Sequence, residues 1–237
     1  RTDTMQYTIG QIKEIINGKG KIVSPDRTIT RLLTDSRSLN FPEGTLFFAI
    51  KTKHGDGHRY VSELYRRGVR DFVVNSAEEY GALEDANFIV VKESIEALQS
   101  LAAYHRSHYD IPIVGITGSD GKTIVKEWAA RAIPDTVRSF ASPKSYNSQL
   151  GVALSLLMLS GEEQVAFIEA GISTPGEKER MERMIKPDVV LYEEGLDNDT
   201  IHGAVTHIMR ADMLIIGGTS LAVYPAAGLI DYYRGDK

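Results

Sequence analysis

A glycine-rich turn followed by a lysine and a threonine is the stretch of this sequence best suited to chemistry. It reads Thr117-Gly-Ser-Asp-Gly-Lys-Thr123 and follows the apolar run Ile113–Ile116. Glycines let the backbone approach a ligand closely, and successive N–H groups at a helix start bind phosphate. In such a loop the lysine reaches the β- and γ-phosphates and the threonine hydroxyl binds Mg²⁺. The predicted ATP-binding residues are Thr117, Gly118, Ser119, Asp120, Gly121, Lys122 and Thr123.

The match to the general phosphate-loop pattern is not strict. Ile116 stands where the first glycine of G-x-x-x-x-G-K-S/T belongs. The alternative is an ordinary strand–turn–helix connection. Gly-Lys-Thr between an apolar strand and a helix favours the phosphate loop.

Other polar residues follow the segments that would return to the same edge of a parallel sheet. Glu169 stands near the end of the apolar run at residues 165–170, and a carboxylate at that end of a strand is a natural Mg²⁺ ligand. Taken alone, such a glutamate would more often be a cap or a salt-bridge partner. Lys144, Asn147 and Ser148 follow the phosphate-loop helix and suit phosphate or substrate contact, although Ser148 equally suits the N-cap of the next helix.

The elements that position these residues alternate between strand and helix, which predicts an α/β fold with parallel or mixed sheets. Thr8 is the candidate N-cap of the first helix. Strands are predicted at residues 45–50, 71–75, 88–91, 113–116 and 165–170, and helices at residues 7–16, 58–68, 94–107, 125–132, 150–159 and 175–185.

Composition narrows the class of protein. The chain has 237 residues, 42% hydrophobic and 25% charged, as expected of a globular protein with one large domain or two ordinary ones. Its net charge of −5 does not suggest a nucleic-acid partner. The absence of cysteine removes disulfides and thiolate zinc sites and fits a cytoplasmic location. We predict no membrane span, and we expect residues 1–4, which precede Met5, to be a leader or a remnant of upstream sequence.

Three segments near the N-terminus, together with the T-G-S-D-G-K-T loop, carry a family resemblance. They are Thr34-Asp-Ser-Arg37, the stretch at residues 44–50 (G-T-L-F-F-A-I) and Asp56-Gly-His58. They resemble the Mur ligases, which build the peptide stem of peptidoglycan. The resemblance implies a UDP-sugar-binding domain at residues 5–108, with Ser36, Arg37 and His58 at the ligand. From the residues alone, a surface salt bridge between Asp35 and Arg37 is the alternative.

The same resemblance implies a function for residues 109–186, as the first half of a central ATPase domain. Mur ligases form amide bonds with ATP and Mg²⁺ as cofactors. Here ATP would phosphorylate the terminal carboxylate of a UDP-N-acetylmuramoyl-tripeptide, and D-alanyl-D-alanine would attack the acyl phosphate. Lys122 and Glu169 would be catalytic, and Thr123 and Glu169 would hold the metal. Residues 142–151 are similar to the family's segment over the nucleotide and acyl-phosphate site.

From residue 187 the pattern changes. Residues 187–237 resemble the sirtuin NAD-dependent deacylases, chiefly in Gly218-Thr-Ser-Leu221 after an apolar strand. The resemblance implies an NAD-type turn at Gly218, Thr219 and Ser220, although no cysteine is present for the sirtuin zinc site. We expect residues 188–192 and 213–217 to add strands that complete a parallel, three-layer P-loop or Rossmann-like core.

The resemblances leave the activity of the chain open. The Mur ligase pattern stops before the later ATPase segments and the third, amine-binding domain, so we expect a truncated ligase without turnover. The alternatives are a non-catalytic nucleotide- or UDP-sugar-binding chimera and an NAD-binding sirtuin-like fragment. A natural fusion, an engineered chimera and a sequence-assembly artefact all fit the junction near residue 186. The sequence does not indicate an oligomeric state.

Overall fold

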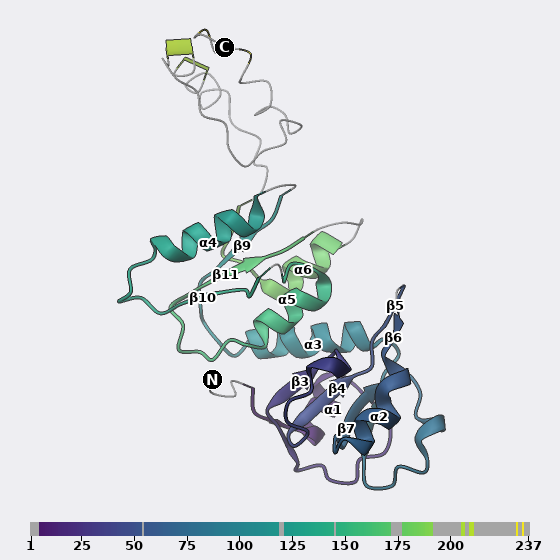
Figure 1. Cartoon of the computed structure of the whole chain (residues 1–237). Helices are drawn as coiled ribbons and strands as arrows, with labels where there is room; N and C mark the ends of the chain where they lie inside the picture. The colour runs from purple at the N-terminus through teal and green to yellow at the C-terminus, as the bar shows by residue number, and fades with distance from the viewer. Residues whose placement is uncertain are drawn as a thin grey trace.

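The structure, a computed structural model, describes residues 5–53, 55–118, 121–144, 146–171 and 177–191, with residues 205–206, 209–210, 231 and 234. Within these residues the chain forms an N-terminal lobe and a central lobe, each built on a four-stranded parallel sheet (Figure 1). The predicted α/β class is therefore confirmed. No helix among the described residues is long and apolar enough to cross a membrane.

The sheet of the N-terminal lobe has the order β3-β4-β7-β8, with all neighbours parallel. Its strands are β3 Arg31–Leu33, β4 Thr45–Phe48, β7 Asp71–Val74 and β8 Asn87–Val90. Every residue of β4 and β7 is buried, as is typical of inner strands covered on both faces.

Short elements surround this sheet. The N-cap prediction for Thr8 is confirmed, because its hydroxyl accepts from the N–H of Gln11 (3.2 Å) and the Gln11 side chain accepts from the N–H of Thr8 (2.8 Å). Two antiparallel pairs were not predicted, since two-residue strands carry no periodicity. The short elements are β1 Tyr7–Thr8, α1 Ile9–Ile15, β2 Thr28–Ile29, η1 Ser36–Ser38, β5 Lys51–Thr52, β6 Gly55–Asp56, η2 Gly57–Tyr60, α2 Val61–Arg66 and η3 Glu78–Tyr80.

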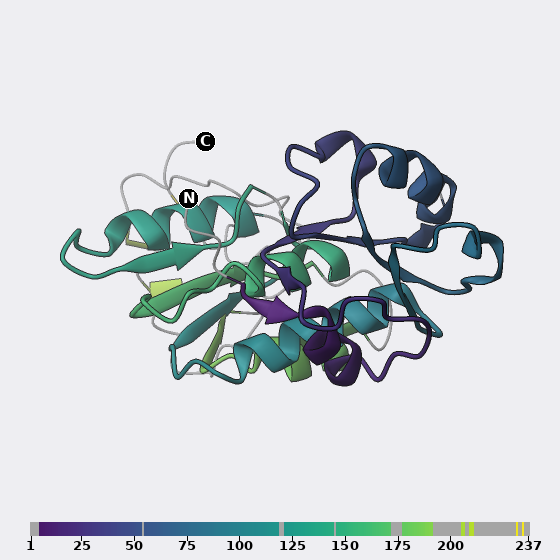
Figure 2. The same ribbon diagram turned by 90° about the horizontal axis from the view of Figure 1, so that it is seen from below.

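The sheet of the central lobe has the order β10-β11-β9-β12 and is parallel throughout. Helix α4 covers one face, while α5, α6 and α3 lie on the other (Figure 2). The chain leaves β9 toward β10 and later returns to the opposite side of β9. Ligands bind at the carboxyl ends of strands at such a switch point. The elements are β9 Ile113–Ile116, α4 Lys122–Ala132, β10 Ser139–Ala141, α5 Gln149–Leu156, β11 Val165–Glu169, α6 Glu177–Ile185 and β12 Val189–Leu191.

The strand predicted at residues 188–192 is present as β12, paired with β9. Asp188 fixes the start of this pairing: its carboxylate accepts from the N–H of Ile113 (2.7 Å) and its own N–H donates to the carbonyl of Ile113 (2.9 Å). The strand predicted at residues 213–217 lies outside the described residues. Strand β10 was missed, since it is a short and partly exposed edge strand.

Helix α3, Ser94–Arg106, joins the two lobes. It packs against α5 and α6 of the central lobe and against α1 of the N-terminal lobe. One continuous hydrophobic core consequently runs from Met5 to Ile185. Arg106, which is buried, donates hydrogen bonds to the carbonyls of Ile111 (3.1 Å) and Ile185 (3.2 Å). The predicted boundary at residue 108 stays a prediction, and the helix just before it belongs to the core of both lobes.

His105, near the end of α3, connects three segments. Its Nε2 lies 2.8 Å from the carbonyl oxygen of Leu159, and its Nδ1 lies 2.9 Å from the hydroxyl of Tyr7. A carbonyl only accepts, so Nε2 carries the proton and Nδ1 accepts from Tyr7. Burial holds the pKa of His105 below its usual value.

We predict that this histidine makes the fold sensitive to acid. The unfolded chain takes up a proton near the ordinary histidine pKa of about 6.5, while the folded chain resists protonation. His105 therefore contributes stability above pH about 6.5 that is lost as the pH falls toward its lower pKa in the folded state. Urea denaturation at pH 7.5, 6.5 and 5.5 should show a smaller pH slope in His105→Gln. Equal slopes in wild type and His105→Gln would contradict the prediction.

Candidate nucleotide and magnesium site

The turn after β9 has the backbone geometry that its glycines predict. Gly118 and Gly121 have φ values of 133° and 76°, in the region that residues with a side chain rarely adopt. Helix α4 begins at Lys122 with Gly121 as its N-cap. The first N–H groups of the helix are therefore at the turn, at the positive end of the helix dipole. Ser119 and Asp120 lie outside the described residues.

Lys122 lies across this turn. Its ammonium donates a hydrogen bond to the carbonyl of Gly118 at 2.6 Å. The charge is thus placed at the loop where phosphate oxygens would bind. Thr117, at the start of the turn, lines an apolar cavity of about 270 Å³ beside β12 and α6.

Glu169 is the centre of the site. Its side chain is fully buried at the end of β11. The hydroxyl of Thr123 lies 2.9 Å from both carboxylate oxygens, and the amide of Asn147 donates to Oε1 at 2.8 Å. The backbone N–H of Glu169 donates to the hydroxyl of Ser142 at 3.1 Å. The sequence predicted only that Thr123, Asn147 and Glu169 lie at the same edge of the sheet. In the structure their side chains are in direct contact.

Lys126 completes this cluster and was missed by sequence reasoning. Its ammonium lies 3.4 Å from Oε2 of Glu169 and donates to the carbonyls of Ser142 (2.7 Å) and Lys144. The side chain has no exposed surface, although lysine is almost never fully buried unless it is paired. The available signal was its spacing, since it follows Thr123 by three residues and so shares a helix face with it.

The three polar residues of the 142–148 loop have different roles. Asn147 reaches Glu169 with its side chain, and its carbonyl accepts from the N–H of Gly171 at 2.6 Å. Ser148 is the N-cap of α5, accepting from the N–H of Gly151 at 3.1 Å, as the alternative interpretation predicted. Lys144 is exposed and contributes its carbonyl to Lys126.

The side chains present fit a magnesium ion. Mg²⁺ prefers hard oxygen ligands and usually keeps one or two protein ligands while the phosphates and water supply the rest. Thr123 and Glu169 provide a hydroxyl and a carboxylate at the phosphate turn. Among the described residues no three His, Asp or Glu side chains gather into a larger metal cluster. Two protein ligands suit a magnesium ion whose other ligands are nucleotide phosphates and water.

In the N-terminal lobe, Arg37 forms the surface salt bridge that was the alternative to ligand binding. Its guanidinium lies 2.7 Å from Asp35, and its side chain is 88% exposed. Hydrogen bonds from Arg37 hold the pKa of Asp35 below its usual value. Ser36 is buried in η1, which Asp35 caps. Because exposed salt bridges add little stability, an incoming phosphate could compete for Arg37, and its ligand role stays a prediction.

His58 uses both ring nitrogens inside the protein. Nδ1 lies 2.6 Å from the carboxylate of Asp56, and Nε2 accepts from the N–H of Asn75 at 3.0 Å. The ring lines a polar cavity of about 340 Å³ that also includes Lys51 and Arg59. A UDP-sugar contact by His58 stays a prediction, and it would use the carbon edge of the ring or replace one of these hydrogen bonds.

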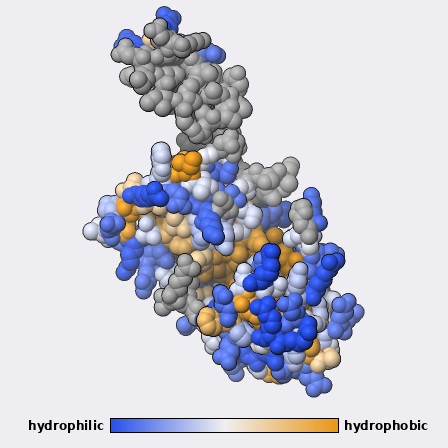
Figure 3. All heavy atoms as spheres, viewed as in Figure 1, coloured by the Kyte–Doolittle hydropathy of each residue, from blue (hydrophilic) through white to orange (hydrophobic). Residues whose placement is uncertain are grey.

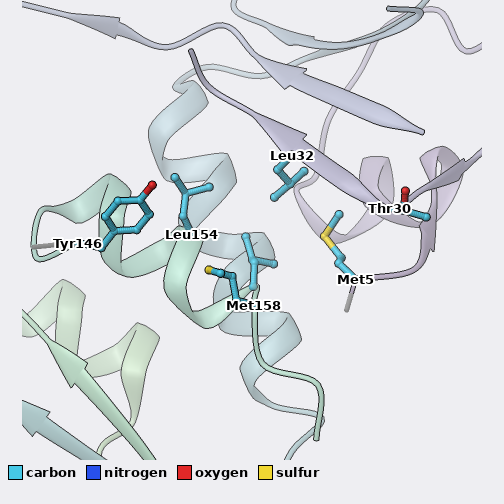
Figure 4. A pocket seen from close by; sticks show the side chains of 7 residues that line it. Met5, Thr30, Leu32, Tyr146, Leu154 and Met158 are labelled. Atoms are coloured by element: carbon cyan, nitrogen blue, oxygen red, sulfur yellow. The ribbon is translucent and has the colours of Figure 1, made fainter. Parts of the chain in front are cut away.

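A groove lined mainly by leucine and methionine side chains lies between the two lobes. Met5, Thr30 and Leu32 form one wall, and the segment from Tyr146 to Met158 forms the other, around a cavity of about 250 Å³ (Figure 4). The space-filling view shows hydrophobic surface gathered where the lobes meet (Figure 3). An adjoining cavity shares Leu32 and Met158 and extends to residues 38–41. The groove thus runs from Tyr146, next to Asn147, to the end of η1 and the residues that follow it.

Comparisons with known proteins agree with this geometry. The family model of the Mur ligase middle domain matches residues 116–227. The UDP-N-acetylmuramoyl-tripeptide–D-alanyl-D-alanine ligase of Bacillus subtilis is 27% identical over 218 residues, which cover 90% of this chain and 47% of that protein. A MurF crystal structure from Acinetobacter baumannii superposes with a TM-score of 0.72 at 26% identity, covering 81% of this chain and 41% of that one. The resemblance to the Mur ligases is confirmed.

Two further findings qualify this Mur ligase resemblance. The chain spans less than half the length of these relatives, and the family match continues beyond residue 186, where we expected the pattern to stop.

A NAD-dependent protein deacetylase of Clostridium perfringens is 70% identical over 54 residues, 23% of this chain and 22% of that protein. The expected relationship of a short segment to these deacylases is therefore confirmed. The NAD-type turn predicted at Gly218, Thr219 and Ser220 lies outside the described residues.

We predict that Gly151 is needed for the contacts around Glu169 to form. A Cβ atom there would lie 2.8 Å from the backbone Cα and C atoms of Tyr146. Backbone cannot yield as a flexible side chain does, so Gly151→Ala should displace Asn147 from Glu169. We expect a loss of about 1–3 kcal/mol in unfolding free energy, measured by urea denaturation. Gly81→Ala, where nothing lies within 4 Å of the new atom, is the matched control. Equal stability of the two variants would show that the loop adapts.

Proposed function

We propose that this chain binds Mg·ATP at the start of α4 and a UDP-sugar precursor in the N-terminal lobe, as part of an ATP-dependent ligase of peptidoglycan-precursor synthesis. The contact of Thr123 and Asn147 with the buried carboxylate of Glu169, beside the turn of Gly118 and Gly121, carries this proposal. A hydroxyl and a carboxylate at the N-terminus of a helix form a site for a nucleotide with its metal ion. One of the solved Mur ligase structures similar to this chain, from Thermotoga maritima, holds ADP.

The chemistry follows from where the charges lie. Lys122 and the N–H groups of the turn would bind the phosphates, and Thr123 and Glu169 would hold Mg²⁺, which neutralises phosphate charge when bound. The carboxylate of a UDP-N-acetylmuramoyl-tripeptide would attack the γ-phosphorus, releasing ADP and giving an acyl phosphate. The amine of D-alanyl-D-alanine would then displace phosphate and lose a proton, leaving an amide.

The groove between the lobes suits the substrate of this reaction. One end lies beside Tyr146, next to Asn147 of the nucleotide site, and the other end lies at residues 38–41, next to Arg37. A substrate with a UDP-sugar at one end and a peptide carboxylate at the other could therefore reach both regions. Relatives that act on a UDP-N-acetylmuramoyl-tripeptide, by their names, support this choice of substrate, and the groove lining, mostly apolar with Arg31 at one end, is compatible with it.

A NAD-binding role is the second candidate, supported by the segment similar to deacetylases. It would use Gly218, Thr219 and Ser220 as a ribose–phosphate turn. The absence of turnover expected from the sequence, and a purely binding role, also stay predictions. Release of phosphate together with mass detection of the pentapeptide product measures ligation directly.

We predict that Mg·ATP raises the melting temperature of the protein and that NAD does not. At one hundred times the dissociation constant, a ligand adds about 2.7 kcal/mol of stability. Lys122→Ala should remove the shift, because the ammonium at the phosphate turn is lost, whereas Lys53→Ala, an exposed lysine of the N-terminal lobe, should retain it. A shift with NAD alone that survives Lys122→Ala would favour the second candidate.

We predict that Arg37→Ala weakens binding of a UDP-N-acetylmuramoyl-tripeptide about tenfold or more, as expected for loss of a charged hydrogen bond to phosphate. Stability should hardly change, because the salt bridge with Asp35 is exposed. Isothermal titration calorimetry measures the affinity, with Arg66→Ala on α2 as the control. Unchanged affinity in Arg37→Ala would restrict this residue to its surface salt bridge.

A further inference from the structure

Among the described residues of the site, Lys126 is the one buried charge to which the proposed chemistry assigns no role. It lies one helical turn after Lys122, on the face of α4 that meets β10 and β11. Lys122 is directed to the phosphate turn, while Lys126 is directed into the 142–148 loop. The two lysines therefore act on different segments.

The ammonium of Lys126 is fully occupied by protein acceptors. An ammonium has three N–H donors. Here the carbonyls of Ser142 and Lys144 accept hydrogen bonds, Glu169 lies at 3.4 Å, and Glu127 lies at 3.5 Å on the outer side. Since the side chain is also completely buried, it is not placed to touch a substrate, and its effect must pass through the groups that it holds.

The groups that it holds are those that orient the carboxylate of Glu169. Asn147 donates to Oε1 from one side, and Lys126 lies beside Oε2 on the other. The loop that carries Asn147 bends around the ammonium: Lys144 has a φ of 48°, and the N–H of Tyr146 donates to the carbonyl of Pro143 at 3.1 Å. Backbone carbonyls converging on one cation stabilise a bend that residues with side chains rarely adopt.

We propose that Lys126 is a positioning residue that acts as an internal cation, holding the 142–148 loop and the carboxylate of Glu169 in the arrangement that receives the metal ion of a bound nucleotide. Its effect on Mg·ATP rests on the proposed function. Its effect on the loop does not, because the loop contacts join protein groups only. The two effects can be measured separately.

The first measurement is the hydrogen exchange of loop amides in nucleotide-free protein. Glu169→Gln keeps the ammonium on the two carbonyls, whereas the double variant Lys126→Met/Glu169→Gln removes both charges, so that neither is left buried without a partner. We expect the amides of residues 146–148 to exchange at least tenfold faster in the double variant than in Glu169→Gln. Equal exchange in these variants would overturn the proposal, whatever the protein binds.

The second measurement is the ratio of ATP affinities with Mg²⁺ and with EDTA, by calorimetry well below the melting temperature. Lys126→Met should lower this ratio at least fivefold toward that of Glu169→Gln, with the Mg²⁺-free affinity within twofold of wild type. Arg131→Met, at the exposed end of the same helix, is the control and should keep the ratio. A lower melting temperature with an unchanged ratio would mean a purely structural lysine and overturn the proposal. If wild type binds no ATP, the proposed function fails and the exchange result alone decides the role of Lys126.

Discussion

A carboxylate taken completely out of water must be surrounded by donors, and the central lobe is arranged around one such group. Glu169 is contacted by Thr123 from α4, Asn147 from the loop before α5 and Lys126 from the next turn of α4. These contacts require β11 to lie next to β9, since only then does the end of β11 face the start of α4. The strand order, the phosphate turn and the 142–148 loop therefore meet at one buried charge.

The two lobes are linked by packing that continues through α3. Because this helix contacts α1 on one side and α5 and α6 on the other, apolar residues of both lobes belong to one core. Lobes joined by a large apolar interface move less freely than lobes joined by a polar one. Arg106 and His105 add hydrogen bonds across the same junction, to Ile111, Ile185 and Leu159. Apolar residues that line the groove between the lobes therefore pack against one shared hydrophobic core.

Strand β12 extends the central sheet across the junction where we expected the Mur ligase pattern to stop. The strand follows Pro187 and joins β9 in parallel. Gly115 permits close packing there, because a Cβ atom would lie 3.3 Å from Pro187. Val189 and Val190 are exposed, and β12 is the last strand in the order β10-β11-β9-β12, so it forms an edge of the sheet within the described residues. The match of the Mur ligase middle domain to residues 116–227 includes this strand, as expected if β12 belongs to the family's own sheet.

The sequence by itself determined what depends on neighbours along the chain. The glycine turn, the Thr8 and Ser148 caps and nearly all of the longer strands and helices were predicted, because turn conformation, capping and periodicity are local. Contacts between distant segments were decided only by the tertiary structure. Burial changed Lys126 from an ordinary helix lysine into an internal cation, and folding of the 142–148 loop selected Asn147 rather than Lys144 for the site. It also engaged both nitrogens of His58. A buried charge or a histidine tautomer is set by partners in other segments, and no local pattern records those partners.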